Sequence, residues 1–169
     1  MFRESPEEPD HDLYLQYQVG NEFFASATKD VFMILKSFGI IRVPGSPEYM
    51  PGAIFHGGMI LPVVNMRLKL ELMPVNIQND DYTILVMNLE ENPSYHEKIH
   101  VGVMVDNVTA LHKVPRNNID LHIHHLFPSY PNLIQGMLHL KDLNLMIPDT
   151  RNLFKRDELA GMMEACSQL

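Results

Sequence analysis

Three histidines in the stretch LHIHHLF, residues 121–127, are the side chains best suited to hold a metal ion. On a strand, His122 and His124 would project from one face, close enough to share an ion, and His112 or Asp120 could supply a third ligand. No acidic residue has zinc-like spacing in this region, and the region holds no cysteine. A histidine-lined surface patch is therefore the favoured interpretation. We expect no cofactor, and His122 and His124 are the candidate ligands if a metal binds.

Nucleophilic catalysis finds no support in the residue pattern. Cys166, the one cysteine of the chain, falls in a predicted terminal helix without a nearby histidine. Ser26, Ser46 and Ser129 have no nucleophile-elbow motif around them. The sequence therefore predicts no catalytic residue.

A glycine-rich hairpin at residues 52–70, GAIFHGGMILPVVNMRLKL, organises the rest of the chain. Two short apolar runs flank Gly57 and Gly58, and such a pair is a strong hairpin signal because primed turns need positive φ, which only glycine adopts without steric cost. Pro62 has no amide hydrogen to donate, which predicts a strand edge or a bulge at that residue. Gly58 and Pro62 are therefore expected to have structural roles.

The hairpin recurs in the second half of the chain. Residues 136–153 align with residues 52–69 without a gap, and the proline-rich approach to each hairpin matches in the same alignment. The alignment pairs Gly52 with Gly136, Asn65 with Asp149, and Arg67 with Arg151. The two glycines and the two arginines are expected to be structural, the arginines binding carbonyl groups across the barrel. We infer an internal duplication with half of the chain in each copy.

The remaining segments are mostly strand-like. Short apolar runs predict strands at 13–19, 22–27, 40–43, 82–89 and 99–105, with a short turn or helix at residue 28 that leads into a further strand. Residues 105–108 are similar in sequence to residues 28–31. The sequence offset between these two segments is slightly smaller than that between the hairpins, so the copies differ by an insertion or deletion. Residues 155–169 carry the apolar spacing of one amphipathic helix. The pattern predicts an all-β fold of two small antiparallel barrels or sandwiches, followed by a C-terminal helix.

Composition limits the classes of partner. The 169 residues carry a net charge of −8, which is the wrong sign for a protein that neutralises nucleic-acid phosphates. No apolar run is long enough for a membrane span, so no direct membrane insertion is expected. A single cysteine fits a reducing compartment, most simply the cytosol. Residues 1–11 are acidic and proline-bearing, which predicts a disordered tail.

From about residue 13 to residue 154 the chain resembles the CheW-type coupling proteins of bacterial chemotaxis. The resemblance rests on LYLQYQVGNEFFASATKDVFMI, on the 52–70 block, on HVGVMVDNVTALHKVP and on QGMLHLKDLNLMIPDTRNL. It implies two five-stranded, SH3-like barrels within residues 12–154, as pseudo-symmetric lobes at about 17–75 and 82–153 with the chain crossing between them. It also implies a non-enzymatic adaptor that links the regulatory domain of a CheA-type histidine kinase to the helical cytoplasmic tips of chemoreceptors. Such an adaptor is cytoplasmic and is recruited to membrane receptor arrays.

The same resemblance indicates which residues would contact partners. The arginine of the family's turn falls on Gly57, and the family's glutamate in the opening segment falls on Met33, so the receptor-facing chemistry looks altered. The expected partner-binding residues lie on the opening segment, on the hairpin turn and after the second strand pair: Val31, Met33, Ile34, Phe55, His56, Gly57, Met59, Asp106 and Val108.

Two kinds of function remain open on the sequence alone. The first is the adaptor, either in swimming chemotaxis or in a chemosensory pathway with a pilus or another output. The second is a small-molecule or metal sensor that keeps the double-barrel scaffold and uses the histidine-rich segment.

Overall fold

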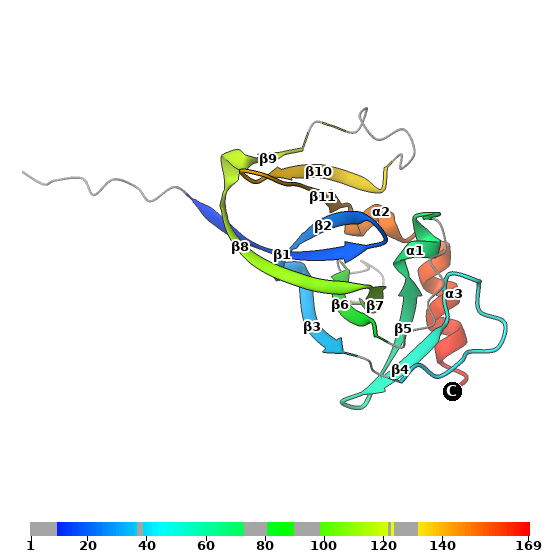
Figure 1. Ribbon diagram of the computed structural model, residues 1–169. Coiled ribbons are helices and arrows are strands. Elements are labelled where there is room, and N and C mark those ends of the chain that lie inside the picture. The colour runs from blue at the N-terminus through cyan, green and yellow to red at the C-terminus, as the bar shows by residue number, and fades with distance from the viewer. Residues whose placement is uncertain (1–9, 37–38, 73–80, 90–98, 122, 124–131) are drawn as a thin grey trace, which may run out of the picture.

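The computed structural model describes residues 10–36, 39–72, 81–89, 99–121, 123 and 132–169. Within these residues the chain is built mainly of short strands, with two four-residue helices and one longer C-terminal helix (Figure 1). The strands are β1 (His11–Val19), β2 (Glu22–Ala27), β3 (Val31–Lys36), β4 (Gly52–His56), β5 (Met59–Asn65), β6 (Thr83–Leu89), β7 (Ile99–Val105), β8 (Asn107–Pro115), β9 (Ile119–Asp120), β10 (Ile134–His139) and β11 (Asn144–Pro148). The helices are α1 (Met66–Lys69), α2 (Thr150–Leu153) and α3 (Arg156–Cys166), and single 3-10 turns are η1 (Thr28–Asp30) and η2 (Arg116–Asn118).

The strands form two sheets, each curled into a barrel. The first sheet has the order β8-β1-β2-β11-β10-β9, and the second has the order β3-β6-β7-β5-β4. In the first sheet the two edge strands, β8 and β9, are separated only by η2, so one bent stretch of chain forms both edges and closes a five-stranded barrel. In the second sheet Ile41, a few residues after β3, bridges to Ala53 of β4 and closes that barrel in the same way. The predicted fold class is confirmed.

The chain crosses between the barrels twice. β1 forms a long antiparallel ladder with β8, so the N-terminal hairpin completes the barrel of the C-terminal half (Figure 1). The β6–β7 hairpin pairs instead with β3 and β5. The strands therefore change from one sheet to the other after η1 and at residue 106. Each barrel also contains one parallel pair, β11 with β2 and β5 with β7, where the sequence predicted only antiparallel strands.

The two copies of the duplicated unit fold alike. The hairpin β4–β5 is followed by α1, and the hairpin β10–β11 is followed by α2, at the positions that the sequence alignment pairs. The side chain of Asn65 caps α1 by accepting a hydrogen bond from the amide of Arg67, and that of Asp149 caps α2 by accepting one from the amide of Arg151.

A close backbone approach explains the glycine that opens each hairpin. A Cβ atom on Gly52 would lie 2.0 Å from the carbonyl oxygen of Ile41, and one on Gly136 would lie 2.6 Å from the carbonyl oxygen of Asp120. Both distances are far inside van der Waals contact. Each glycine therefore sits where the closing strand of its barrel passes directly over it.

Buried side chains form three layers, one inside each barrel and one between them. Successive residues of a strand face opposite ways, so each inner strand serves two layers. On β5, Val63 packs inside the second barrel, while Val64 packs between the barrels. On β11, Ile147 packs inside the first barrel, and Met146 packs in the central layer. α3 runs beside β5 and adds its own apolar side chains to the central layer (Figure 1).

Pro62 lies in the middle of a sheet, which corrects the expected edge or bulge. It pairs with Ala53 of β4, and both the amide and the carbonyl of Ala53 are bonded to Ile41 on the far side. The pair is therefore of the non-hydrogen-bonded kind, which needs no donor from Pro62. On its other side the ladder with β7 begins one residue later, at Val63. A proline fits here because neither neighbouring strand requires its amide hydrogen.

Two boundaries also differ from expectation. His11 already belongs to β1, because its strand neighbour Pro115 holds it in the ladder, so the tail expected at residues 1–11 ends earlier. Residues 1–9 lie outside the described part of the chain. The strand expected at 40–43 is reduced to the single bridge at Ile41. Among the helices of the described residues, none is long and apolar enough to cross a membrane.

Candidate functional site

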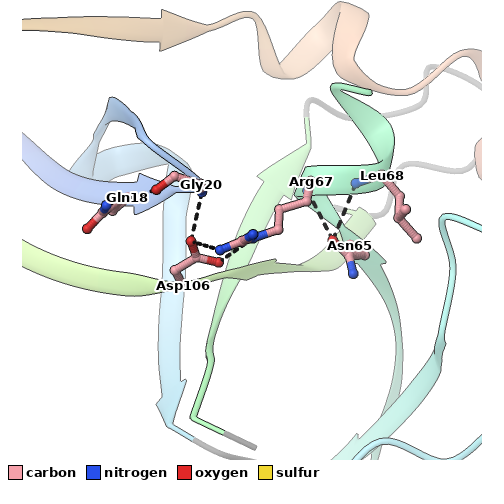
Figure 2. A network of polar contacts seen from close by, with 6 residues as sticks. All are labelled: Gln18, Gly20, Asn65, Arg67, Leu68 and Asp106. Carbon is pink, nitrogen blue, oxygen red and sulfur yellow. Dashed lines mark hydrogen bonds and ion pairs between the residues drawn. The ribbon is translucent and has the colours of Figure 1, made fainter. Parts of the chain in front are cut away.

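An ion pair joins the two barrels where the chain crosses back between them. Arg67 belongs to α1 of the second barrel, and Asp106 is the single residue between β7 and β8 (Figure 2). The Nε and Nη2 groups of Arg67 donate to the two carboxylate oxygens of Asp106 at 2.8 and 2.5 Å. The amide of Gly20, in the β1–β2 turn of the first barrel, donates to the same carboxylate at 2.7 Å. The carboxylate of Asp106 therefore binds α1 of the second barrel and the β1–β2 turn of the first.

Both members of this junction are largely shielded from water. The side chains of Arg67 and Asp106 are only 12% and 28% exposed. Arg67 was expected to bind carbonyl groups, but its partner is a carboxylate in a planar, two-bond geometry that suits a guanidinium. The carboxylate oxygens of Asp106 are engaged within the molecule, and its expected contact with a partner stays a prediction. The Nη1 group of Arg67 is buried without a hydrogen-bond partner among the described residues, a cost that the pairing must offset.

The expected partner residues on β3 divide between its two faces. Val31 packs against the central layer, and so does Val108 at the start of β8, which brings these two predicted residues to the same border between the barrels. Met33 packs against the interior of the second barrel. Ile34 points outward and is exposed. The burial pattern of β3 alternates along the whole strand, which puts Val31 and Met33 on its less exposed face and Ile34 on its exposed face.

Sequence reasoning missed Phe32, which is also exposed and stacks on the ring of His100 with 4.4 Å between the ring centroids. Its signal was present in the alternation of β3, where Phe32, Ile34 and Lys36 are the exposed positions. A large aromatic ring that is half exposed beside an exposed isoleucine is an unusual combination on a strand at the edge of the sheet order.

The predicted hairpin turn is confirmed at Gly57 and Gly58, whose φ angles are 57° and 79°. Both are positive, as a primed two-residue turn between His56 and Met59 requires. A Cβ atom on Gly57 would meet nothing within 4 Å, so the tip of the turn is open to a partner. Phe55, just before it, is 59% exposed. Met59 packs against the interior of the second barrel, as Met33 does.

A polar cavity of about 380 Å³ lies at one end of the first barrel, and no sequence motif indicated it. Its lining includes Arg116 and Arg151 as well as the aromatic ring of Tyr14. Burial and the nearby carboxylates of Asp12 and Asp30 raise the pKa of the Tyr14 phenol, against a smaller opposing effect of Arg116. The lining residues come from β1, β2, β9, β10, β11, η1, η2 and α2, with Asn88 added from β6 of the second barrel, which is why spacing along the chain did not reveal them.

The candidate metal ligands His122 and His124 lie outside the described residues. Within the part of the chain that the structure describes, no group of three or more histidine, cysteine or acidic side chains is placed to hold a metal ion. Cys166 is buried in the central layer, and this burial raises the pKa of its thiol.

The fold and the junction define a class of protein: two SH3-like β-barrels that arose by duplication and share one central core. A family model described as the CheW-like domain matches residues 13–158, and the chain belongs to this family. The resemblance seen in the sequence is thereby confirmed.

Individual relatives agree with this assignment. The chain is 25% identical over 144 residues to a protein named chemotaxis protein CheW from Helicobacter pylori, and the match covers 85% of this chain and 82% of that protein. It is 19% identical over 146 residues to a protein of the same name from Treponema pallidum, with the same two shares covered. Its fold is similar to the crystal structure of scaffolding protein TtCheW from Thermoanaerobacter tengcongensis, with a TM-score of 0.73 over 88% of this chain and 96% of that chain, at 19% identity.

Proposed function

We propose that the protein is a non-enzymatic, cytoplasmic adaptor of a chemotaxis-type signalling pathway. It couples the regulatory domain of a CheA-type histidine kinase to the cytoplasmic helical tip of a chemoreceptor and is recruited to membrane receptor arrays. The family supports an adaptor role, and the structure supplies a surface suited to protein partners.

The observation that carries the proposal is the set of exposed apolar side chains on the second barrel. Phe32 and Ile34 are exposed on β3, and Phe55 is exposed on β4. Ile41 is exposed as well, and its bridge to Ala53 places it on the same edge as Phe55, two residues further along β4. Large apolar groups that remain in water on one barrel mark a surface that a protein partner can cover.

The chemistry of this surface suits a helical bundle. Aliphatic and aromatic side chains pack into the grooves of an amphipathic helix without needing charged pairs. Val31 and Val108 are partly buried at the border between the barrels and add apolar side chains there. The turn at Gly57 has no side chain, so any contact there must use its backbone groups.

A binding assay with purified partners tests the proposal. The full chain should bind a CheA-type regulatory domain and a receptor-tip helical bundle with dissociation constants in the micromolar range. Ile34→Asp and Phe55→Asp should weaken at least one of these complexes about tenfold or more, since an ionised carboxylate cannot be buried against apolar side chains without a partner. Leu111→Asp is the matched control, because Leu111 is equally exposed but lies on β8 of the first barrel.

Two results would contradict the proposal in different ways. Failure to bind either partner at about 100 µM would refute the adaptor function. Binding that is unchanged by both aspartate variants would keep the adaptor function and refute the assigned surface.

The turn offers a second test. Gly57→Arg restores the arginine that the family resemblance expects, and the added side chain meets open space. The positive φ at this residue should cost about 1–2 kcal/mol of folding stability. If the missing arginine limits receptor binding, the variant should bind the receptor tip more tightly than the wild type. Unchanged affinity in a folded variant would mean that the turn has only a structural role.

A further inference from the structure

The duplication places one arginine in the short helix of each barrel. Among the described residues, only the arginine of the second barrel pairs with a carboxylate from the segment where the chain crosses between the barrels. Arg67 follows β5, and Arg151 follows β11, at matching positions. The partner of Arg67 is Asp106, between β7 and β8. When the segment at 105–108 is aligned with residues 28–31, the counterpart of Asp106 is Lys29 in η1, between β2 and β3.

Strand pairing supports this correspondence. β7 pairs in parallel with β5, the strand that ends just before Arg67. β2 likewise pairs in parallel with β11, the strand that ends just before Arg151. Asp106, which follows β7, therefore comes close to Arg67. In the same way η1, which follows β2, comes close to Arg151. In the first barrel this segment brings Lys29, a cation, to a position where the second barrel has an anion.

Arg151 is consequently open to a ligand. Its side chain is 61% exposed, against 12% for Arg67. The one ion pair that it makes with a described residue is a long contact of 3.7 Å between its Nε and an oxygen of Asp149. The oxygens of Asp149 already accept hydrogen bonds from the amide of Arg151 and from the side chain of Asn152. Lys29 and Arg151 both line the cavity at the end of the first barrel.

Lys29 and Arg151 are the two cations of the cavity that remain once Arg116 is paired with its own carboxylates. The lining holds three cations and two carboxylates, with Arg116 as the third cation and Asp12 and Asp30 as the acids. Arg116 is engaged with Asp12 at 3.1 Å and also with Asp10, which lies outside the lining, at 2.6 Å. The Tyr14 phenol stays protonated, because its pKa is raised, and its hydroxyl can donate a hydrogen bond at neutral pH.

We propose that this cavity binds a carboxylate group, which Arg151 and Lys29 hold in the place that Asp106 fills in the second barrel. Arginine binds carboxylates with two parallel hydrogen bonds, the geometry that Arg67 displays here. The carboxylate belongs either to a free small molecule or to an acidic side chain of a partner protein. The proposal does not depend on the adaptor function, because it concerns the other barrel and a different chemistry.

Titration of the full chain by amide NMR tests the proposal with two probes, succinate and a blocked Gly-Glu-Gly peptide, at constant ionic strength. Saturable shifts are expected for the amides of Lys29 and Arg151. Arg151→Ala should weaken binding about tenfold or more, because it removes charge-assisted hydrogen bonds. Arg42→Ala, the matched control at an exposed arginine away from the cavity, should leave binding unchanged.

A second variant tests the comparison between the barrels directly. Lys29→Asp recreates the acid of the other junction, so it should pair with Arg151, abolish binding of both probes and leave the melting temperature equal to or above that of the wild type. Tighter binding of succinate identifies a free small carboxylate as the ligand, and tighter binding of the peptide identifies an acidic side chain. No saturable shift with either probe up to about 20 mM, or equal binding by Arg151→Ala, would overturn the proposal.

Discussion

Removal of the Asp106 carboxylate should destabilise the fold more than any change at an exposed ion pair. Asp106→Ala leaves the guanidinium of Arg67 largely buried without its counter-charge and leaves the amide of Gly20 without its acceptor. Breaking a buried pair by deleting one partner costs about 3–5 kcal/mol. Asp106 retains some contact with water, so we expect an effect somewhat below this range, about 2–3 kcal/mol.

Thermal and urea unfolding of the full chain measure this cost. For a chain of this size, about 2–3 kcal/mol corresponds to a fall in melting temperature of about 5–10 °C. Asp12→Ala is the matched control: the ion pair of Asp12 with Arg116 is exposed, and its loss should change stability by less than about 1 kcal/mol. Asp106→Asn should fall between the two, because the amide oxygen can still accept from Gly20.

A double-mutant cycle with Arg67→Met isolates the pair itself. The double variant Arg67→Met, Asp106→Ala should be more stable than the sum of the two single changes predicts, by about 1 kcal/mol or more. If the single effects are additive, or if Asp106→Ala costs no more than Asp12→Ala, the ion pair does not hold the barrels together and our reasoning is refuted.

Two further predictions concern the hairpin glycine and the C-terminal helix. Gly52→Ala should prevent soluble expression or cost well over about 3 kcal/mol of folding stability, since its Cβ would lie 2.0 Å from the Ile41 carbonyl oxygen. Gly161→Ala, inside α3 with open space around it, should raise folding stability by about 0.5–1 kcal/mol. Equal behaviour of the two variants in unfolding assays would contradict the packing argument. At Glu158, burial favours the neutral carboxyl, but the hydrogen bond from Lys69 and other contacts outweigh this effect and lower the pKa of the carboxyl. The contribution of Glu158 to folding stability is therefore complete above pH 4.5 and is lost as the pH falls through the lowered pKa. Glu158→Gln should therefore reduce folding stability by about 0.5–1 kcal/mol at pH 7, and the stability difference from the wild type should shrink toward pH 3. A stability difference that does not depend on pH would mean that the ion pair is unimportant.

Local rules account for what the sequence could predict. The turn at Gly57 and Gly58 follows from the φ angles that only glycine adopts freely, and the strands around it follow from apolar residues in short runs. The alignment of the two halves predicted matching hairpins, and the caps at Asn65 and Asp149 agree with it at the level of single hydrogen bonds. These features depend on residues that are near one another in the chain.

Features that depend on distant residues could not be predicted in the same way. The partner of Arg67 lies 39 residues away, across the border between the barrels. The crossing of the N-terminal hairpin to the other barrel depends on the β1–β8 ladder, which joins opposite halves of the chain. Pro62 was placed at an edge because its missing donor was considered alone, whereas the bonds of Ala53 to Ile41 on the far side decide that no donor is needed.

Divergence after duplication explains why the two crossings of the chain are now unequal. A strand begins directly after each crossing, and its first apolar residue packs against the central layer. This residue is Val31 after η1 and Val108 after Asp106. At the second crossing the carboxylate of Asp106 fixes the junction to both barrels. At the first crossing the corresponding residue is Lys29, and the same geometry leaves a charged cavity. Because backbone geometry is set by the glycines and caps that both copies keep, the charge at this one position distinguishes an internal ion pair from a candidate binding site.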